Sequence, residues 1–423
     1  MFKKLSVAAV ICCAAQTSAY AFDFAQALNQ GKVEGELRTV YYGRSADGAP
    51  FFPKAGGLAG GGFIRFSTAP VNHISAQIAG YTTQKLIGSG KMLANTHLLD
   101  GTKGFSMFGE LNLRYDDDRT QLIVGRQALT TPLVGSDDAR VIKDLFAAAY
   151  FSSKLNDNIT PHLLYVDNMS GLDNGNNNKS WVSMSKVLGT TYNRGLYAGG
   201  VDVDSGAGLQ GSAWLYEIPQ TVSMFYANAK YSSDAAPTLT YELHGWRSRS
   251  QSRYEADRRA RGKGSTTINY FDVGARVTAD LSDQFRAQLA VDLMRKSAGS
   301  HTIHTYAGNY AEYTYGFLMG SGAYGAISTG NPNSDMTRMN SVKVTLEYKF
   351  QPETKLHVGY VVMKSNMPTL QSNMNLLDIR LTSDHVFDPH VSVALLYENW
   401  HADQHQAFFI NNNLARARVS YHF

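Results

Sequence analysis

The chain has 423 residues, of which 43% are hydrophobic and only 17% charged, against the roughly 25% charged residues typical of soluble domains. Its 24 tyrosines, 20 phenylalanines and 38 glycines fit a membrane-inserted β-protein, although composition alone leaves a secreted soluble β-protein open. The near balance of 39 basic and 35 acidic residues argues against nucleic acid as a partner, because binding to a phosphate backbone requires a dominant basic face.

The N-terminus has the parts of a secretory signal peptide. Two lysines precede the apolar stretch Leu5–Ala15, and Ala19-Tyr20-Ala21 supplies small residues at the positions that a signal peptidase reads. We therefore expect a signal peptide over residues 1–21 and one mature domain over residues 22–423. Both cysteines lie within the signal, so the mature protein has no thiol, and its formal charge falls from +4 to +2.

The mature chain carries an alternating pattern that is typical of transmembrane strands. No stretch approaches the roughly 20 apolar residues that a membrane-spanning helix requires, whereas several segments alternate with period two over about 9–11 residues. In 341–350, Val, Val, Leu, Tyr and Phe alternate with Ser, Lys, Thr, Glu and Lys. The closing segment 415–423 repeats the pattern and ends on Phe423, which resembles the signal that the barrel-assembly machinery recognises. A closed barrel is the only other structure that pairs every backbone group in lipid.

The alternating segments and the turn signals between them predict an all-β fold, an antiparallel transmembrane barrel of about 18 strands. The strands are expected to begin near Lys32, Gly60, Asn72, Gly104, Arg119, Leu145, Asn158, Arg194, Leu209, Pro219, Pro237, Ile268, Asp283, Thr337, Thr354, Met374, Asp388 and Asn412. Short connections alternate with long ones, which is the outer-membrane arrangement of periplasmic turns and extracellular loops. The long ones are 43–59, 84–103, 127–144, 167–193, 250–267, 297–336, 365–373 and 401–411.

Two low-complexity stretches and one very short connection affect where the predicted strands begin and end. The glycine run Gly56–Gly62 and the asparagine-rich stretch 174–178 are expected to be loop or loop edge. Around Ile218 and Pro219 the pattern leaves almost no external loop. The strand boundaries between residues 194 and 231 are therefore the least defined.

A barrel of 16–18 strands is too wide for its own side chains to fill. Only residues 22–31 precede the first strand, so loops that fold inward must narrow the pore. The best candidate is 127–144, which puts Asp137, Asp138 and Arg140 within four residues. Opposed charges inside a narrow pore create a transverse field that orients polar solutes. The alternative is a surface loop whose Asp and Arg pair only with each other.

The same stretch resembles a known family. Gly125-Arg126-Gln127, Pro132, Ser136-Asp137-Asp138-Ala139-Arg140 and Phe146 are similar to the third-loop region of the OprD-like porins. This resemblance implies an 18-stranded, substrate-selective outer-membrane channel with an internal basic ladder, and it places Asp137, Asp138 and Arg140 at or near the constriction. Lys143 stands where the family pattern has proline. This difference affects the expected path of the loop but not the class of loop to which it is assigned. The ladder itself does not transfer residue by residue.

Alternation independently nominates charged residues on the water-facing sides of the strands. The cations are Arg38, Arg276, Lys343, Lys349, Arg380, Arg416 and Arg418, and the acids are Glu34, Glu36, Glu110 and Glu347. An excess of fixed cations in the lumen favours anionic or zwitterionic solutes such as carboxylates, amino acids and small peptides. A solvated face without selectivity is the alternative.

The densest basic run lies in a predicted external loop and its edge. Its members are Arg247, Arg249, Arg253, Arg258, Arg259, Arg261 and Lys263. Contact with anionic surface lipid such as lipopolysaccharide, an electropositive funnel at the pore mouth, and a plain solvated loop all fit this run.

Other classes of function are less well supported by the residues. The sequence holds no recognisable arrangement of nucleophile and base, so we predict no enzyme activity, no catalytic residue and no cofactor. His301 with His304 and His401 with His405 have spacings that a metal could use, but no helix aligns them, and no metal site is predicted. A closed adhesin or structural barrel is the stronger rival, because the loop 297–336 could bind a surface or plug the lumen. Expected partners are small polar solutes, outer-membrane lipid and the barrel-assembly machinery, and both a homotrimer and a monomer stay open.

Overall fold

The computed structural model describes most of the mature chain. The described residues are 24–46, 54–136, 138–171, 174, 178–233, 235, 237–263, 266–301, 314, 337–365, 373–386, 388–402 and 411–423. Within these ranges no helix is long and apolar enough to cross a membrane. Asp137, the tyrosines at 306, 310, 313 and 315, and the histidines at 304 and 405 lie outside the described residues.

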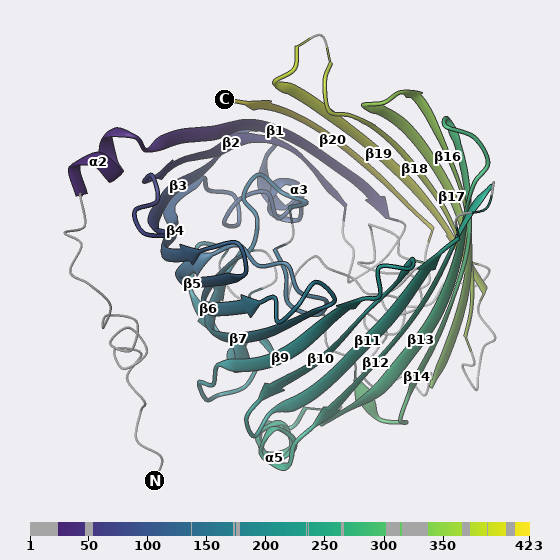
Figure 1. Cartoon of the computed structure of the whole chain (residues 1–423). Coiled ribbons are helices and arrows are strands. Elements are labelled where there is room, and N and C mark those ends of the chain that lie inside the picture. The colour runs from purple at the N-terminus through teal and green to yellow at the C-terminus, as the bar shows by residue number, and fades with distance from the viewer. Residues whose placement is uncertain are drawn as a thin grey trace.

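Eighteen antiparallel strands form one closed wall, because the first strand pairs with the last from Glu36↔His422 to Ala46↔Asn412. Figure 1 shows the sheet curling round until the purple first strand, β1, lies beside the yellow last strand, β20. The wall strands are β1 (Lys32–Ala46), β2 (Ala55–Ser67), β3 (Ile74–Ile87), β4 (Phe105–Asp116), β5 (Thr120–Gln127), β6 (Leu145–Ser153), β7 (Ile159–Ser170), β9 (Leu196–Asp204), β10 (Leu209–Ile218), β11 (Val222–Ser232), β12 (Thr238–Ser250), β13 (Thr267–Asp280), β14 (Phe285–Lys296), β16 (Arg338–Gln351), β17 (Thr354–Ser365), β18 (Asn373–Ser383), β19 (Val391–Ala402) and β20 (Asn412–His422).

The remaining described elements are short and are not part of the wall. Two-residue strands, β8 and β15, pair with β7 and β13. Four short helices precede the barrel or lie in its connections. These elements are β8 (Val182–Ser183), β15 (Ser300–His301), α2 (Phe24–Asn29), α3 (Gly90–Ala94), α4 (Met184–Val187) and α5 (Ser252–Ala260).

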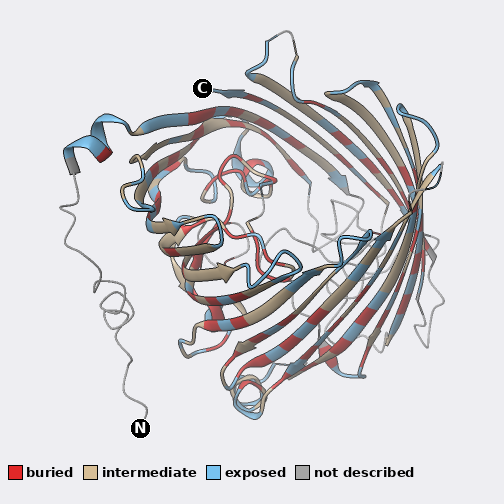
Figure 2. Ribbon diagram, viewed as in Figure 1, coloured by how far each residue is buried: buried red, intermediate tan, exposed pale blue. Residues whose placement is uncertain are grey.

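Burial follows the period-two alternation that the sequence shows. In β16 the outward Val342, Val344 and Leu346 are 43%, 50% and 45% exposed, whereas the inward Lys343 and Thr345 are buried. Figure 2 shows this as alternating red and blue bands along the strands. An apolar outer face with a polar inner face is the pattern of strands that have lipid on one side and a lumen on the other.

The predicted strand starts agree with the structure to within three residues for every wall strand except β2. There the prediction of a loop through Gly56–Gly62 is wrong, since β2 begins at Ala55 and its glycines pair with β1. Glycine carries neither an apolar nor a polar side chain, so a run of glycines does not show the alternation of apolar and polar residues that marks a strand. Gly62 is required where it stands, because its φ is +135° and a Cβ would lie 1.8 Å from the Glu36 carbonyl oxygen.

The tight connection near Ile218 is confirmed. β10 and β11 are joined by three residues, the Thr221 backbone N–H donates to the Ile218 carbonyl at 2.9 Å, and Gln220 takes a positive φ of 64°. Above this turn packs α5, whose Tyr254 N–H donates to the Gln220 carbonyl at 3.2 Å. The helix α5 therefore covers the turn between β10 and β11 in place of a longer loop.

Three of the long connections fold back inside the wall. The connections 88–104, 128–144 and 171–195 contribute fully buried side chains, including Leu93, Leu133, Val134 and Met184, to one hydrophobic cluster with inward residues of the strands. Figure 1 shows these segments within the ring of strands. These connections and the wall strands beside them carry the polar groups of the candidate site.

Candidate functional site

The connection 128–144 reaches across the lumen. At one side the Leu133 N–H donates to the Tyr216 hydroxyl of β10 at 3.4 Å, and at the other Arg416 of β20 donates to the Ala139 carbonyl at 3.0 Å. Its apolar side chains Leu133 and Val134 are fully buried. The segment is therefore an internal loop, and the alternative of a surface loop is wrong.

Arg38 of β1 holds this loop to the wall. Its guanidinium donates to both carboxylate oxygens of Glu36 at 2.7 and 2.8 Å and to both oxygens of Asp138 at 2.6 and 3.0 Å. A fifth bond runs to the Arg140 carbonyl at 2.8 Å. The planar fork of arginine suits this paired recognition of carboxylates. Arg38 is only 6% exposed, so these bonds form away from bulk water.

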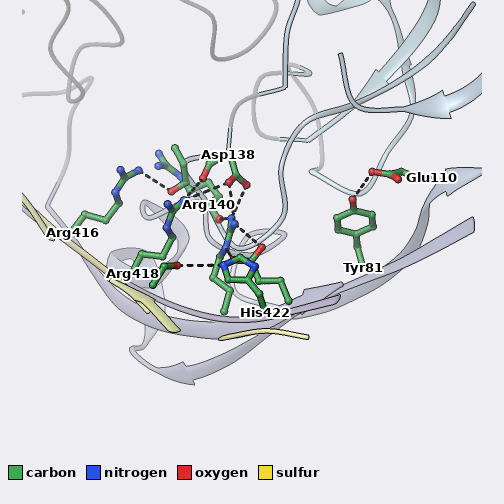
Figure 3. A network of polar contacts seen from close by, with 11 residues as sticks. Tyr81, Glu110, Asp138, Arg140, Arg416, Arg418 and His422 are labelled. Atoms are coloured by element: carbon green, nitrogen blue, oxygen red, sulfur yellow. Dashed lines mark hydrogen bonds and ion pairs between the residues drawn. The ribbon is translucent and has the colours of Figure 1, made fainter. Parts of the chain in front are cut away.

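Two further arginines support the same loop from β20. Arg418 donates to the Asp138 carbonyl at 3.2 Å and lies 3.5 Å from its carboxylate, while Arg416 bonds to Ala139. Figure 3 shows both side chains extending from the strand toward Asp138. Asp138 thus pairs with cations of the wall, a hundred or more residues away in sequence.

A second group of cations lies beside the loop. The Arg140 guanidinium stacks 4.9 Å above the ring of Tyr42, and Arg44 lies 5.9 Å from the same ring. His97, from the connection 88–104, and Arg140 together line a narrow pocket of about 10 Å³, which holds about one water molecule and no solute. The loop therefore seals against this part of the wall.

Lys143, where the family pattern has proline, also turns inward. Its ammonium lies 5.7 Å from the ring of Phe63 on β2. A cation over an aromatic face is a favourable contact. The substitution therefore adds a positive charge to the lumen without removing the loop from it.

Every residue of the predicted ladder lies on an inward face, and most are ion-paired. Arg276 bonds Glu242 at 2.6 Å, and the Asp378 carboxylate is held by Lys343 at 3.1 Å and Arg380 at 2.6 Å. Further pairs join Arg65 to Glu34 and Glu110, and Arg286 to Glu347, while half-buried Lys349 lies near the short-turn end of β16.

Sequence reasoning missed several inward charges. Arg44 was assigned to the predicted loop 43–59, whereas it belongs to β1, and Arg65 was not nominated although it lies in the strand predicted from Gly60, where outward Ile64 implies that Arg65 points inward. Asp378, Glu242, Asp272 and Asp292 follow the alternation of their strands and could have been found from it.

The charges of His97 and Asp138, at the internal loops, should stay constant from pH 8 to about pH 5. Enclosure by the loops, together with the charges of Arg140 and Arg44, lowers the pKa of His97 to about 4. Burial raises the pKa of Asp138, but the hydrogen bonds and charge of Arg38 outweigh it and hold that pKa below its ordinary value. Folding stability should therefore fall from about pH 6.5 as unfolded His97 takes up protons, and lose the Asp138 contribution only below about pH 4.

The measurement is the reversal potential in a salt gradient between pH 4 and 8. The rise in anion selectivity that depends on His97 should appear only near pH 4, and His97→Gln should remove that step. A His97-dependent step near pH 6.5 would contradict the expected shift.

Comparison with solved structures gives three close matches in fold. The chain is similar to OpdK of Pseudomonas aeruginosa, solved with vanillate (TM-score 0.71, 17% identity, 94% of this chain and 99% of that one). OccK9 (OpdG) of the same species superposes with a TM-score of 0.75 at 12% identity over 94% and 99%, and OccAB4 of Acinetobacter baumannii with 0.73 at 13% over 93% and 98%. No protein-family model and no curated protein sequence matches. The chain therefore has the fold of the OprD-like outer-membrane channels, as its third-loop stretch predicts.

Proposed function

We propose that this protein is an outer-membrane porin through which small polar solutes diffuse passively. The observation that carries the proposal is the loop 128–144, fastened across the lumen by Arg38, Arg416 and Arg418. An 18-strand wall encloses a space that side chains alone do not fill, and a fixed internal loop narrows it. Such a pore selects by size and charge without a catalytic residue or cofactor, and we assign none.

We propose that the constriction comprises Asp137, Asp138 and Arg140 together with the wall arginines, and that it favours anions. Five guanidinium groups lie on or beside this loop, those of Arg38, Arg44, Arg140, Arg416 and Arg418, and the described acids near them include Glu36, Asp138 and, near Arg418, Asp384. With Asp137, which lies outside the described residues, the five cations still outnumber these acids. A positive constriction lowers the barrier for anions and raises it for cations.

The solute class that fits best is a small carboxylate. The carboxylate of a solute can replace that of Asp138 as the partner of Arg418. It can then bind in turn to the ladder cations Arg380, Lys343 and Arg276. Zwitterionic amino acids and small peptides fit the same alternation of cations and acids. OpdK, similar in fold, was crystallised with vanillate, which is itself a carboxylate.

The test is planar-bilayer recording of the refolded mature protein. We expect discrete conductance steps and, in a salt gradient, a reversal potential of the sign set by anion flow. Heat-modifiable migration in gels is the control for folding. A folded barrel that leaves the bilayer silent would reject the porin in favour of a plugged or adhesive barrel, and a cation-selective reversal potential would reject the positive constriction.

Two partners follow as proposals from the surface and the termini. Arg247 and Arg249 line an outer groove of about 490 Å³ with Leu215 and Phe225, which suits the phosphate and acyl groups of lipopolysaccharide. Phe423 exchanges backbone hydrogen bonds with Gly35 at 2.9 and 3.1 Å, at the seam that the barrel-assembly machinery would close. Export by a signal over residues 1–21 and assembly as a trimer or monomer complete the proposal.

A further inference from the structure

Three ionisable side chains meet at one buried point on the inner wall, away from the internal loop. His244 of β12 and Asp292 of β14 both pair in register with Gly274 of β13, and Asp272 lies two residues before that glycine on the same face. The His244 Nε2 atom lies 2.7 Å from Asp272 Oδ1 and 3.3 Å from Asp292 Oδ1. All three side chains have 0% exposure.

Gly274 creates the space in which these groups converge. A Cβ at this position would lie 2.0 Å from Asp292 Oδ1 and 2.5 Å from His244 Cε1. The backbone φ of Gly274 is not in the left-handed region, so conformational freedom does not require glycine here. The missing side chain instead lets groups from the two flanking strands reach across β13.

The cluster is short of positive charge. Asp272 Oδ2 and Asp292 Oδ1 are buried and accept no hydrogen bond from the residues that the structure describes. Two ionised carboxylates beside one imidazole carry a net negative charge even when the imidazole is protonated, and among the described residues Arg295 acts on Asp272 without an ion pair or hydrogen bond to it. Burying such a charge is costly unless it is paired or coordinates a metal.

We propose that His244, Asp272 and Asp292 bind one divalent transition-metal ion, with Zn²⁺ as the best fit. Imidazole nitrogen and carboxylate oxygen are both common ligands of Zn²⁺, at about 2.0–2.2 Å from the ion. The three donor atoms lie within 4.8 Å of one another, so small rotations bring each into range. Ca²⁺ needs six to eight oxygens and fits poorly.

The second shell supports this assignment. The Thr314 backbone N–H donates to Asp292 Oδ2 at 2.6 Å, and its hydroxyl lies 2.6 Å from that of Ser341 on β16. Such outer bonds orient a carboxylate ligand and leave its other oxygen for the metal. The ion would join β12, β13 and β14 and, through Asp292, hold Thr314 against the inner wall.

The experiment is titration of refolded, metal-stripped protein in detergent with ZnCl₂ alone, by calorimetry and by metal content after gel filtration. We expect one tightly bound equivalent, and zinc X-ray absorption should show a nitrogen and oxygen shell at about 2.0–2.1 Å. Asp292→Asn and Asp272→Asn, which keep side-chain shape, should each weaken binding at least about 100-fold, the upper end of the loss for an outer-shell partner. Gly274→Ala should abolish it by filling the space.

The matched control is His162→Gln. His162 also faces the lumen and pairs with an aspartate, Asp202, at 3.0 Å, but that carboxylate is 52% exposed and no second acid pairs with His162 among the described residues. This variant should bind Zn²⁺ like the wild type. No tight equivalent in the wild type, or binding that survives both aspartate substitutions, would overturn the proposal, and the second outcome would assign the zinc to surface histidines.

Discussion

Replacing Arg38 by methionine should release the internal loop and widen the pore. The substitution leaves Glu36, which is 5% exposed, as a buried carboxylate without its partner. Breaking a buried pair in this way costs about 3–5 kcal/mol. We therefore expect the free energy of unfolding in urea to fall by about that amount, and single-channel recordings to show a larger and noisier open current.

Arg65→Met is the matched control for Arg38→Met. Arg65 also bridges two inward acids, Glu34 and Glu110, but none of its described hydrogen bonds reaches the loop. It should lose stability while keeping a conductance near that of the wild type. Adding Glu36→Gln to Arg38→Met should restore stability without restoring the current. An Arg38→Met current equal to the wild-type current would show that the loop is not held in this way.

The double substitution of Arg416 and Arg418 by glutamine should shift the pore toward cations. Glutamine can still donate to the Ala139 and Asp138 carbonyls, so the loop keeps its position while two positive charges leave. Each charge acts on an ion 4 Å away with about 1 kcal/mol in a water-filled lumen, so after screening we expect the anion-to-cation permeability ratio to fall roughly tenfold. The reversal potential in a salt gradient measures this ratio.

Lys349→Gln provides the comparison for this double variant. Lys349 is an inward cation near the short-turn end of the wall, away from the loop. Its loss should change the permeability ratio less than twofold. Equal shifts in the two variants would mean that selectivity arises along the whole lumen and not at the loop.

The wall of the barrel could be predicted because its signal is local. A strand between lipid and water must alternate with period two, and a closed sheet must pair its last strand with its first, so segments such as 341–350 and 415–423 identify themselves. The glycine run of β2 was mispredicted for the same reason. Without side chains it shows no alternation, and only the register with β1 reveals the strand.

The loop stretch 127–144 and its charges were also recognisable from sequence, but their partners were not. Asp138 was considered as a partner of Arg140, two positions away in the same motif, whereas the structure pairs it with Arg38 and Arg418, 100 and 280 residues away. No pattern of neighbouring residues indicates a contact between residues so far apart in the sequence. Closure of the barrel brings β20 beside β1 and places both strands against the loop 128–144.

The sequence by itself determined the class of fold, the number of strands and the inward face of the nominated charged residues, because these depend on neighbours along the chain. The tertiary structure alone decided which charges meet. His244, Asp272 and Asp292 come together only because strand register aligns two of them on Gly274, and a shift by one residue would send any of them to the opposite face. Contacts between strands depend on register, and register is set by the whole sheet.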